Sequence, residues 1–199
     1  MRSGLASAYL ALCAAVLFWG LSFPATKLAL EGLSPFVLLL IRFAVAAALL
    51  WPLVLRGGRP RLTLGLHLRV LGVSVLFPGC YFACETLGLT LTTATNAALI
   101  DATIPLVVLG LSALLLRERQ NPARVGAVLA SLTGAGMVVG GGASPANAGD
   151  ALMLGAVVSA ALYMLAGASL TRRVPPLTFT ALQMLYGTLF FLPQGAPRL

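Results

Sequence analysis

Four charged side chains lie inside long apolar segments of this chain, where an unpaired charge is costly. Lys27 and Arg42 belong to two consecutive apolar segments, and Glu85 and Asp101 belong to the next two. Ionisable residues in such segments usually face a partner or a water-filled cavity, and they mark the path of a substrate or an ion. These four residues therefore predict either fixed links between helices or a site that binds and moves a small polar molecule.

The spacing of the four charges places them at one depth. Each lies six to nine residues from a turn, the bases from the turn near residue 33 and the acids from the threonine turn at 90–95. A helical rise of about 1.5 Å per residue puts all four roughly 9–13 Å below the same surface. We expect the two bases and two acids to be able to neutralise one another. Lys27 could instead reach the outer headgroups, and Arg42 could pair permanently with one acid.

Two further polar residues are candidates for the same site. Asn96 adds polarity near Asp101, and Trp19 either lines a cavity or packs between helices. Three prolines lie inside apolar segments, where each removes a backbone donor and permits a kink. Such breaks are tolerated in membranes beside a cavity or a neighbouring helix. The predicted helix breaks are at Pro24, Pro78 and Pro105.

Composition identifies the class of protein. The chain is 59% hydrophobic and 9% charged, whereas a soluble domain has about 25% charged residues. A membrane span needs roughly 20 apolar residues. The sequence therefore predicts an all-α polytopic membrane protein, with the lipid bilayer as a partner and with spans at about 8–30, 35–55, 67–89, 95–116, 125–139, 150–170 and 177–192.

Basic residues indicate how the spans are oriented. The net charge of +8 would suggest nucleic acid in a soluble protein, but here the arginines gather in alternate short loops. The loops on the other side hold Glu31, the threonine turn and Asp150. Because positively charged loops stay in the cytoplasm, we expect a cytoplasmic N-terminus, a bacterial inner-membrane location and no nucleic-acid partner. The arginines in question are 2, 56, 59, 61, 69, 117, 119, 124, 172 and 173.

Enzyme and metal chemistry have no signature in the sequence. The chain contains no Walker, G-x-S-x-G or H-E-x-x-H motif, so we expect no enzyme activity, no cofactor and no metal site. Cys13, Cys80 and Cys84 lie in apolar segments and are interpreted as small apolar filler. The 125–139 segment carries small residues that include Gly136 and Gly140, a spacing typical of close helix packing.

An internal repeat is also present. Residues 34–52 align without gaps with residues 175–193, and the prolines at both ends match. The offset spans five helices, an odd number, so the second copy must be inverted in the membrane. Inverted repeats are typical of secondary transporters. The sequence thus predicts one complete five-helix repeat at 1–141, a linker loop at 142–149, and two helices of a second repeat at 150–199.

Several segments resemble a known family. FWGLSFPATKLAL, LSPFVLLLIRF, IPLVVLGLSALLLRERQNPARVGAVLASLTGAGMVV and GDALMLGAVVSAALYMLAGASLTRR are similar to the EamA-type drug/metabolite transporters. The resemblance implies ten helices in two inverted repeats around a central cavity, and export or exchange of a small metabolite. The positions that match the family pattern are Trp19, Gly20, Lys27, Arg42, Phe43, Pro105, Glu118 and Arg119.

Two features depart from that family. Asp101 stands where a small or apolar residue is expected, and the chain ends after the seventh of ten helices.

The resemblance and the membrane class together predict a permease that exports or exchanges a small-molecule substrate by alternating access. Its partners would be helices 8–10 on another chain or a second copy in a homo-oligomer. The alternative is a truncated membrane protein that does not transport, or a partner subunit.

Overall fold

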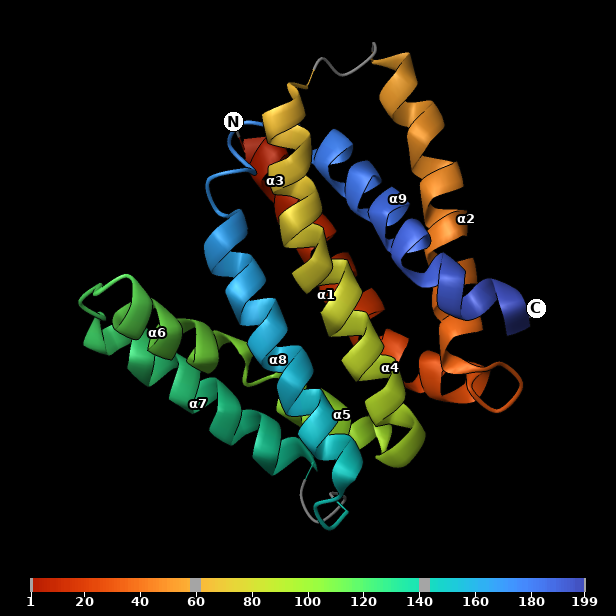
Figure 1. Cartoon of the computed structure of the whole chain (residues 1–199). Helices are drawn as coiled ribbons and strands as arrows, with labels where there is room; N and C mark the ends of the chain where they lie inside the picture. The colour runs from red at the N-terminus through yellow and green to blue at the C-terminus, as the bar shows by residue number, and fades with distance from the viewer. Residues whose placement is uncertain (1, 58–61, 140–143, 199) are drawn as a thin grey trace.

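The computed structural model is entirely helical in the residues that it describes, which are 2–57, 62–139 and 144–198 (Figure 1). Arg59, Arg61 and Gly140 lie outside these residues. In chain order the helices are α1 (Arg2–Ala29), α2 (Pro35–Arg56), α3 (Leu64–Ser74), the π-helix η1 (Val75–Cys80), α4 (Tyr81–Leu91), α5 (Ala94–Asp101), α6 (Ile104–Leu115), α7 (Pro122–Val139), α8 (Ala148–Gly167), α9 (Pro176–Gly195) and the 3₁₀ helix η3 (Ala196–Arg198).

The predicted spans coincide with these helices, but not all of them meet the requirements of a span. Five described segments are long and apolar enough to cross a membrane: Leu5–Ala29, Pro35–Arg56, Leu64–Leu91, Ala94–Leu115 and Ala148–Gly167. The predicted spans at 125–139 and 177–192 form α7 and α9, which fall outside this set. Gln183 and Gln194 lower the hydropathy of α9.

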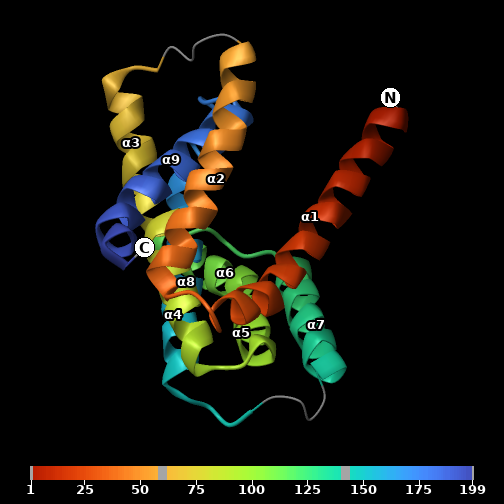
Figure 2. The ribbon, with the colours of Figure 1, turned by 90° about the vertical axis from the view of Figure 1, so that its right-hand side faces the viewer.

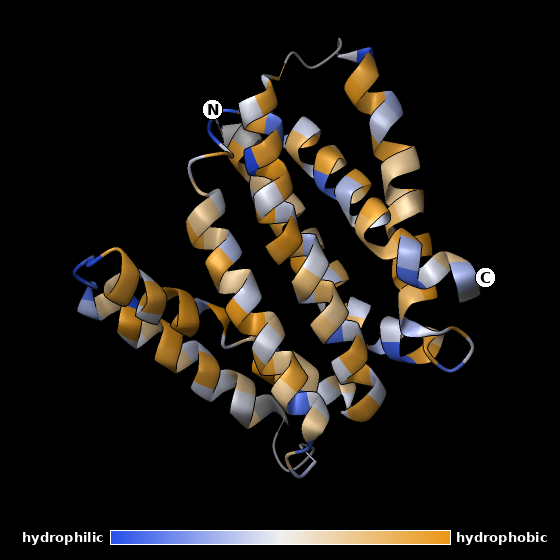
Figure 3. Cartoon of the chain, viewed as in Figure 1, coloured by the Kyte–Doolittle hydropathy of each residue, from blue (hydrophilic) through white to orange (hydrophobic). Residues whose placement is uncertain are grey.

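The helices confirm the all-α membrane class. Figure 3 shows apolar residues along most helices and hydrophilic residues gathered in the α6–α7 connection. Near the upper end of Figure 1 lie the N-terminal part of α1 and the α8–α9 connection, whereas the α4–α5 connection and the start of α8 lie at the lower end. The basic α8–α9 connection is thus separated from the α4–α5 connection, and the α6–α7 connection lies at neither end.

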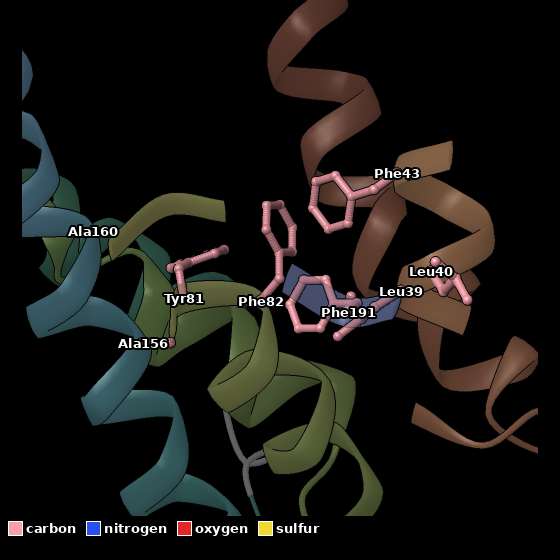
Figure 4. Close-up of a cluster of buried hydrophobic side chains, with 8 residues drawn as sticks. All are labelled: Leu39, Leu40, Phe43, Tyr81, Phe82, Ala156, Ala160 and Phe191. Carbon is pink, nitrogen blue, oxygen red and sulfur yellow. The ribbon is translucent and has the colours of Figure 1, made fainter. Parts of the chain in front are cut away.

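The core forms where α2 packs along α9 and α4 packs along α8. One cluster joins all four helices through Leu39, Leu40, Phe43, Tyr81, Phe82, Ala156, Ala160 and Phe191 (Figure 4). Phe43 and Phe191 stack with ring centroids 5.6 Å apart. Gly187 of α9 lies against Phe43 of α2, and the later Gly195 lies against the earlier Phe36. The two helices therefore run antiparallel.

Helix α1 packs against the bundle through its C-terminal half, as far as the described residues show. Phe23 is 3% exposed and packs with Leu89, Ala97 and Met153, whereas earlier side chains such as Leu10 and Phe18 are more than 70% exposed. Figure 2 shows α1 leaving the bundle at an angle toward its N-terminus. These exposed apolar side chains suit contact with lipid, and the space between α1 and its neighbours opens into the cavities described below.

Helix α7 packs differently from what the small residues predicted. It contacts α6 and α5, yet a Cβ added at Gly126, Gly134 or Gly136 would meet no atom within 4 Å. The described glycines of α7 therefore face away from the neighbouring helices. The glycine spacing identified small residues, but it could not show which face of the helix is covered.

Proline interrupts two of the three helices as expected. At Pro78 two helical stretches meet at a kink within η1, where Phe77 has non-helical φ/ψ of −143° and 112° and the Phe77–Pro78 peptide is cis. At Pro105 the helix stops at Asp101 and restarts at Ile104. The expected break at Pro24 is not seen, since α1 continues from Arg2 to Ala29. A long helix can tolerate the loss of one backbone donor, and Pro24 lies on its exposed side.

Side chains from α8 and α9 donate to backbone carbonyls at the Pro78 break. Ser159 Oγ donates to Leu76 O at 2.9 Å, and Gln183 Nε2 donates to Phe77 O at 2.9 Å. Tyr163 Oη in turn donates to Gln183 Oε1 at 3.3 Å. The break in the third predicted span is therefore held by residues that lie about 80 to 105 positions later in the chain.

Gln183→Leu should destabilise the protein by about 1–3 kcal/mol, because Phe77 O and the Tyr163 hydroxyl would lose their partner in a buried place. Gln183 is 5% exposed. Thermal unfolding of the purified protein in detergent measures this effect. Gln194→Leu is the matched control, since Gln194 is exposed in the same helix. Equal unfolding midpoints for the two variants would contradict the structural role of Gln183.

Candidate functional site

Two cavities meet at Trp19, on the side of α1 that faces α4 and α5. The first has a volume of about 410 Å³ and is lined by Leu12, Ala15, Val16, Trp19, Gly20, Phe23, Ala98, Asp101 and Ala102. The second, of about 270 Å³, is lined by Ala15, Phe18, Trp19, Ser22, Arg42, Phe82 and Glu85. Both cavities are therefore largely apolar, and each contains a carboxylate.

Asp101 is held between two aromatic donors at the first cavity. Tyr81 Oη donates to Oδ1 at 2.8 Å, and Trp19 Nε1 donates to Oδ2 at 3.1 Å. Asp101 is 8% exposed and Tyr81 is fully buried. The three residues come from α1, α4 and α5, and Asp101 is the last residue of α5 before the Pro105 break. Asp101 thus links α1 and α4 at the point where its own helix is interrupted.

Glu85 lies one helical turn after Tyr81 and lines the second cavity. It is 2% exposed, and its buried Oε2 has no hydrogen-bond partner among the described residues. An unsatisfied buried polar atom is unusual and indicates strain, catalysis or a group that binds a missing partner. Glu85 is therefore the strongest ligand-binding candidate among the predicted residues.

Arg42 faces Glu85 across the same cavity. Its guanidinium carbon lies 4.6 Å from the centre of the Phe82 ring, a cation–π contact. Within the part of the chain that the structure describes, this guanidinium donates no hydrogen bond and forms no ion pair with Glu85. Both side chains nevertheless lie close enough for their charges to attract each other. Among the described residues, the cavity thus presents a guanidinium and a carboxyl group that have no hydrogen bond to each other.

Lys27 and Asn96 are placed elsewhere. Lys27 Nζ donates to Leu89 O at 2.5 Å and to Thr92 O at 2.7 Å, at the C-terminal end of α4. A cation at a helix C-terminus is favoured by the helix dipole. Asn96 donates to the Asp150 carboxylate at 3.3 Å and pairs with the backbone of Ser144. Both residues fix α1, α4, α5 and α8 together, and neither lines the two cavities at Trp19.

The four charges predicted to neutralise one another are thus dispersed. The structure brings Arg42 and Glu85 to one cavity and Asp101 to the adjoining one, and it directs Lys27 to backbone carbonyls. Tyr81 is the site residue that sequence reasoning missed. Tyr81 lies four residues before Glu85, and residues four apart share a helix face. This spacing was the sequence feature that could have placed Tyr81 at the site. No three His, Cys, Asp or Glu side chains of the described residues lie close enough to hold one metal ion.

The EamA-like transporter family matches this chain over residues 6–140 and 147–198. The chain belongs to this family. The family is one of transporters and not of enzymes, which confirms that expectation. The two matched ranges together include every residue that lines the Trp19 cavities.

Three similar proteins are described as transporters. One from Archaeoglobus fulgidus is 34% identical over 190 residues, covering 93% of this chain and 66% of the relative. A second from that organism is 32% identical and is covered over 65% of its length. YetK of Bacillus subtilis is 31% identical and is covered over 59%. All three are described as uncharacterized transporters, and this chain spans just under two thirds of their length or less. No solved structure gives a match.

Proposed function

We propose that this protein is a permease that exports or exchanges a small polar or amphipathic metabolite by alternating access. The observation that carries the proposal is the second Trp19 cavity, where Arg42 has no acceptor and the Oε2 atom of Glu85 has no donor among the described residues. Burying polar groups without partners costs free energy that a bound substrate would recover. Glu85, Arg42, Asp101 and Trp19 are the proposed binding residues.

The helix breaks supply the movable elements of this proposal. The Pro78 break lies directly before Tyr81 and Phe82, and the Pro105 break follows Asp101. Discontinuous helices near the middle of the membrane are a recurring device for binding and for alternating access. A change at either break would move the residues of both cavities together.

An inverted-repeat organisation fits the packing. We assign residues 1–141 to a first repeat, 142–149 to a linker and 150–199 to two helices of a second repeat. In this assignment α2 and α9 are equivalent, and they pack against each other in antiparallel directions. Elements related by a two-fold axis that lies between them would pack in this way. The basic loops further favour a bacterial cytoplasmic membrane with the N-terminus in the cytoplasm.

A growth assay tests the proposed function. The full chain is expressed in a bacterial strain whose own exporters are deleted, and growth is measured against a panel of toxic metabolites of differing charge. We expect resistance to at least one class of compound. The Arg42→Gln/Glu85→Gln double variant should remove this resistance without changing the net charge of the protein. Equal growth with the chain and with an empty vector across the panel would favour the alternative of a membrane protein that does not transport.

A further inference from the structure

A second polar site lies far from Trp19, at the end of the molecule that carries basic loops. It is a pocket of about 260 Å³ lined by Thr63, Gly65, Leu66, Arg69 and Arg173. Arg69 belongs to the second turn of α3, and Arg173 belongs to the α8–α9 connection. Figure 1 shows this connection, in blue, beside the upper end of α3.

The two arginines are held in place by the residues that follow them. Val70 is 0% exposed and Val174 is 2% exposed, and both belong to one buried cluster that joins α3, the α8–α9 connection and α9. The backbone positions of Arg69 and Arg173 are therefore fixed relative to each other by packing. Fixing two cations beside one pocket in advance reduces the entropic cost of binding an anion there.

The protein itself does not neutralise this pair of charges. The five acidic residues of the chain are Glu31, Glu85, Asp101, Glu118 and Asp150, and none of them lines the pocket. Among the described residues, neither the Arg69 nor the Arg173 guanidinium has a hydrogen bond or ion pair. Two neighbouring guanidinium groups without a counter-charge repel each other, so an anion from outside the chain would stabilise them.

The surroundings of the pocket favour an amphipathic anion. Arg69 lies five residues inside the candidate span Leu64–Leu91, which is roughly 8 Å along the helix and suits the headgroup region. Leu64 and Leu68, one turn apart beside the pocket, are 74% and 57% exposed. The pocket thus combines a cationic centre with an apolar helix face that acyl chains could cover.

We propose that Arg69 and Arg173 bind a phosphate group, supplied by the headgroup of an anionic phospholipid. The planar guanidinium groups donate paired hydrogen bonds to phosphate oxygens, and basic pockets between membrane helices are suited to anionic headgroups. This site is independent of the cavities at Trp19 and of transport. Its role is to anchor the α8–α9 connection to α3 at the membrane surface.

Native mass spectrometry of the purified full chain tests the proposal. Delipidated protein is titrated with phosphatidylglycerol, with phosphatidylcholine and with inorganic phosphate in separate series. We expect tighter binding of phosphatidylglycerol than of phosphatidylcholine. Arg69→Gln and Arg173→Gln should each weaken it roughly fivefold, as expected for one basic contact at a membrane surface. Arg172→Gln is the control, because Arg172 carries the same charge in the same connection and lies outside the pocket.

Three outcomes would overturn this assignment. Equal binding of the two lipids would remove the preference for an anionic headgroup. An equal loss in Arg172→Gln would show attraction by general charge alone. Binding of inorganic phosphate that displaces phosphatidylglycerol from the pocket at similar concentrations would identify a soluble phosphate ligand. The exposure of Arg69, Arg172 and Arg173 means that none of these variants should impair folding.

Discussion

Glu85→Gln should lower the rate of transport roughly ten- to a hundredfold, because a hydrogen bond to a charged group contributes about 1.5–3 kcal/mol. The substitution keeps the size of the side chain and removes the charge that faces the second Trp19 cavity. Because the Glu85 side chain makes no hydrogen bond within the described residues, no hydrogen bond is lost. The amount of protein in the membrane should therefore stay unchanged. Efflux of a compound identified in the growth assay, normalised to membrane abundance, measures the effect.

Thr86→Val is the matched control for Glu85→Gln. Thr86 is the next residue in α4, it is 0% exposed, and its hydroxyl also has no partner. It does not line either Trp19 cavity, so its replacement should leave efflux unchanged. Asp101→Asn should also lower efflux while abundance is kept, since the amide oxygen can still accept the hydrogen bond from Tyr81 and only the Trp19 donor loses its acceptor. Normal efflux in both Glu85→Gln and Asp101→Asn would exclude these carboxylates from the site.

Gly149→Ala should destabilise the protein by about 1–3 kcal/mol or more, as overpacking in a filled core does. A Cβ at this position would lie 2.6 Å from Gly88 O and 2.7 Å from Thr92 N. Both obstacles are backbone atoms of α4 and of the residue that follows it, so they cannot move aside as a flexible side chain would. The first turn of α8 would have to separate from α4. We expect a clear fall in membrane abundance and in the thermal unfolding midpoint.

Gly155→Ala tests the same replacement in the same helix. Its Cβ would meet Cys84 Sγ at 3.6 Å, which is an ordinary contact. Alanine also favours a helix over glycine by about 1 kcal/mol, so Gly155→Ala should be neutral or stabilising. Equal loss of stability in the two variants would contradict the idea that the close approach of Gly88 to Gly149 excludes a side chain at position 149.

The polar groups around Gly149 explain why α8 begins there. Asn147 accepts hydrogen bonds from Gly149 N and Asp150 N, and the Asp150 carboxylate accepts from Asn147 N. This reciprocal arrangement is a capping box. Thr92 Oγ1 donates to Asp150 Oδ1, so the cap of α8 also binds the end of α4. The contact between Gly88 and Gly149 thus lies beside a polar network that joins the start of α8 to the end of α4.

Much of the fold could be predicted because the length of an apolar segment and the position of a proline are local features of the sequence. The spans at Pro35–Arg56 and Ala94–Leu115 and the interruptions at Pro78 and Pro105 follow from short stretches of sequence. The partners of the Pro78 break could not be predicted. Ser159 and Gln183 reach it from helices that follow much later, and no local pattern specifies such a contact.

Helical rise predicts similar depths for Lys27, Arg42, Glu85 and Asp101. It contains no information about which side of each helix faces inward. Lys27 therefore meets the carbonyls of Leu89 and Thr92, and Asp101 meets neutral donors. The predicted pairing of opposite charges rested on depth alone. It did not consider that backbone carbonyls and aromatic donors compete for the same charged side chains.

The Lys27 contact has a consequence for how the protein is made. Its acceptors lie 62 and 65 residues later in the chain, and domains form from the N-terminus as synthesis proceeds. The ammonium group must therefore enter the membrane region before the end of α4 exists. Until then α1 has no buried acceptor for this charge, and we expect the first two helices to remain loosely inserted. Synthesis of the α4–α5 hairpin is the step that locks the first helix in place.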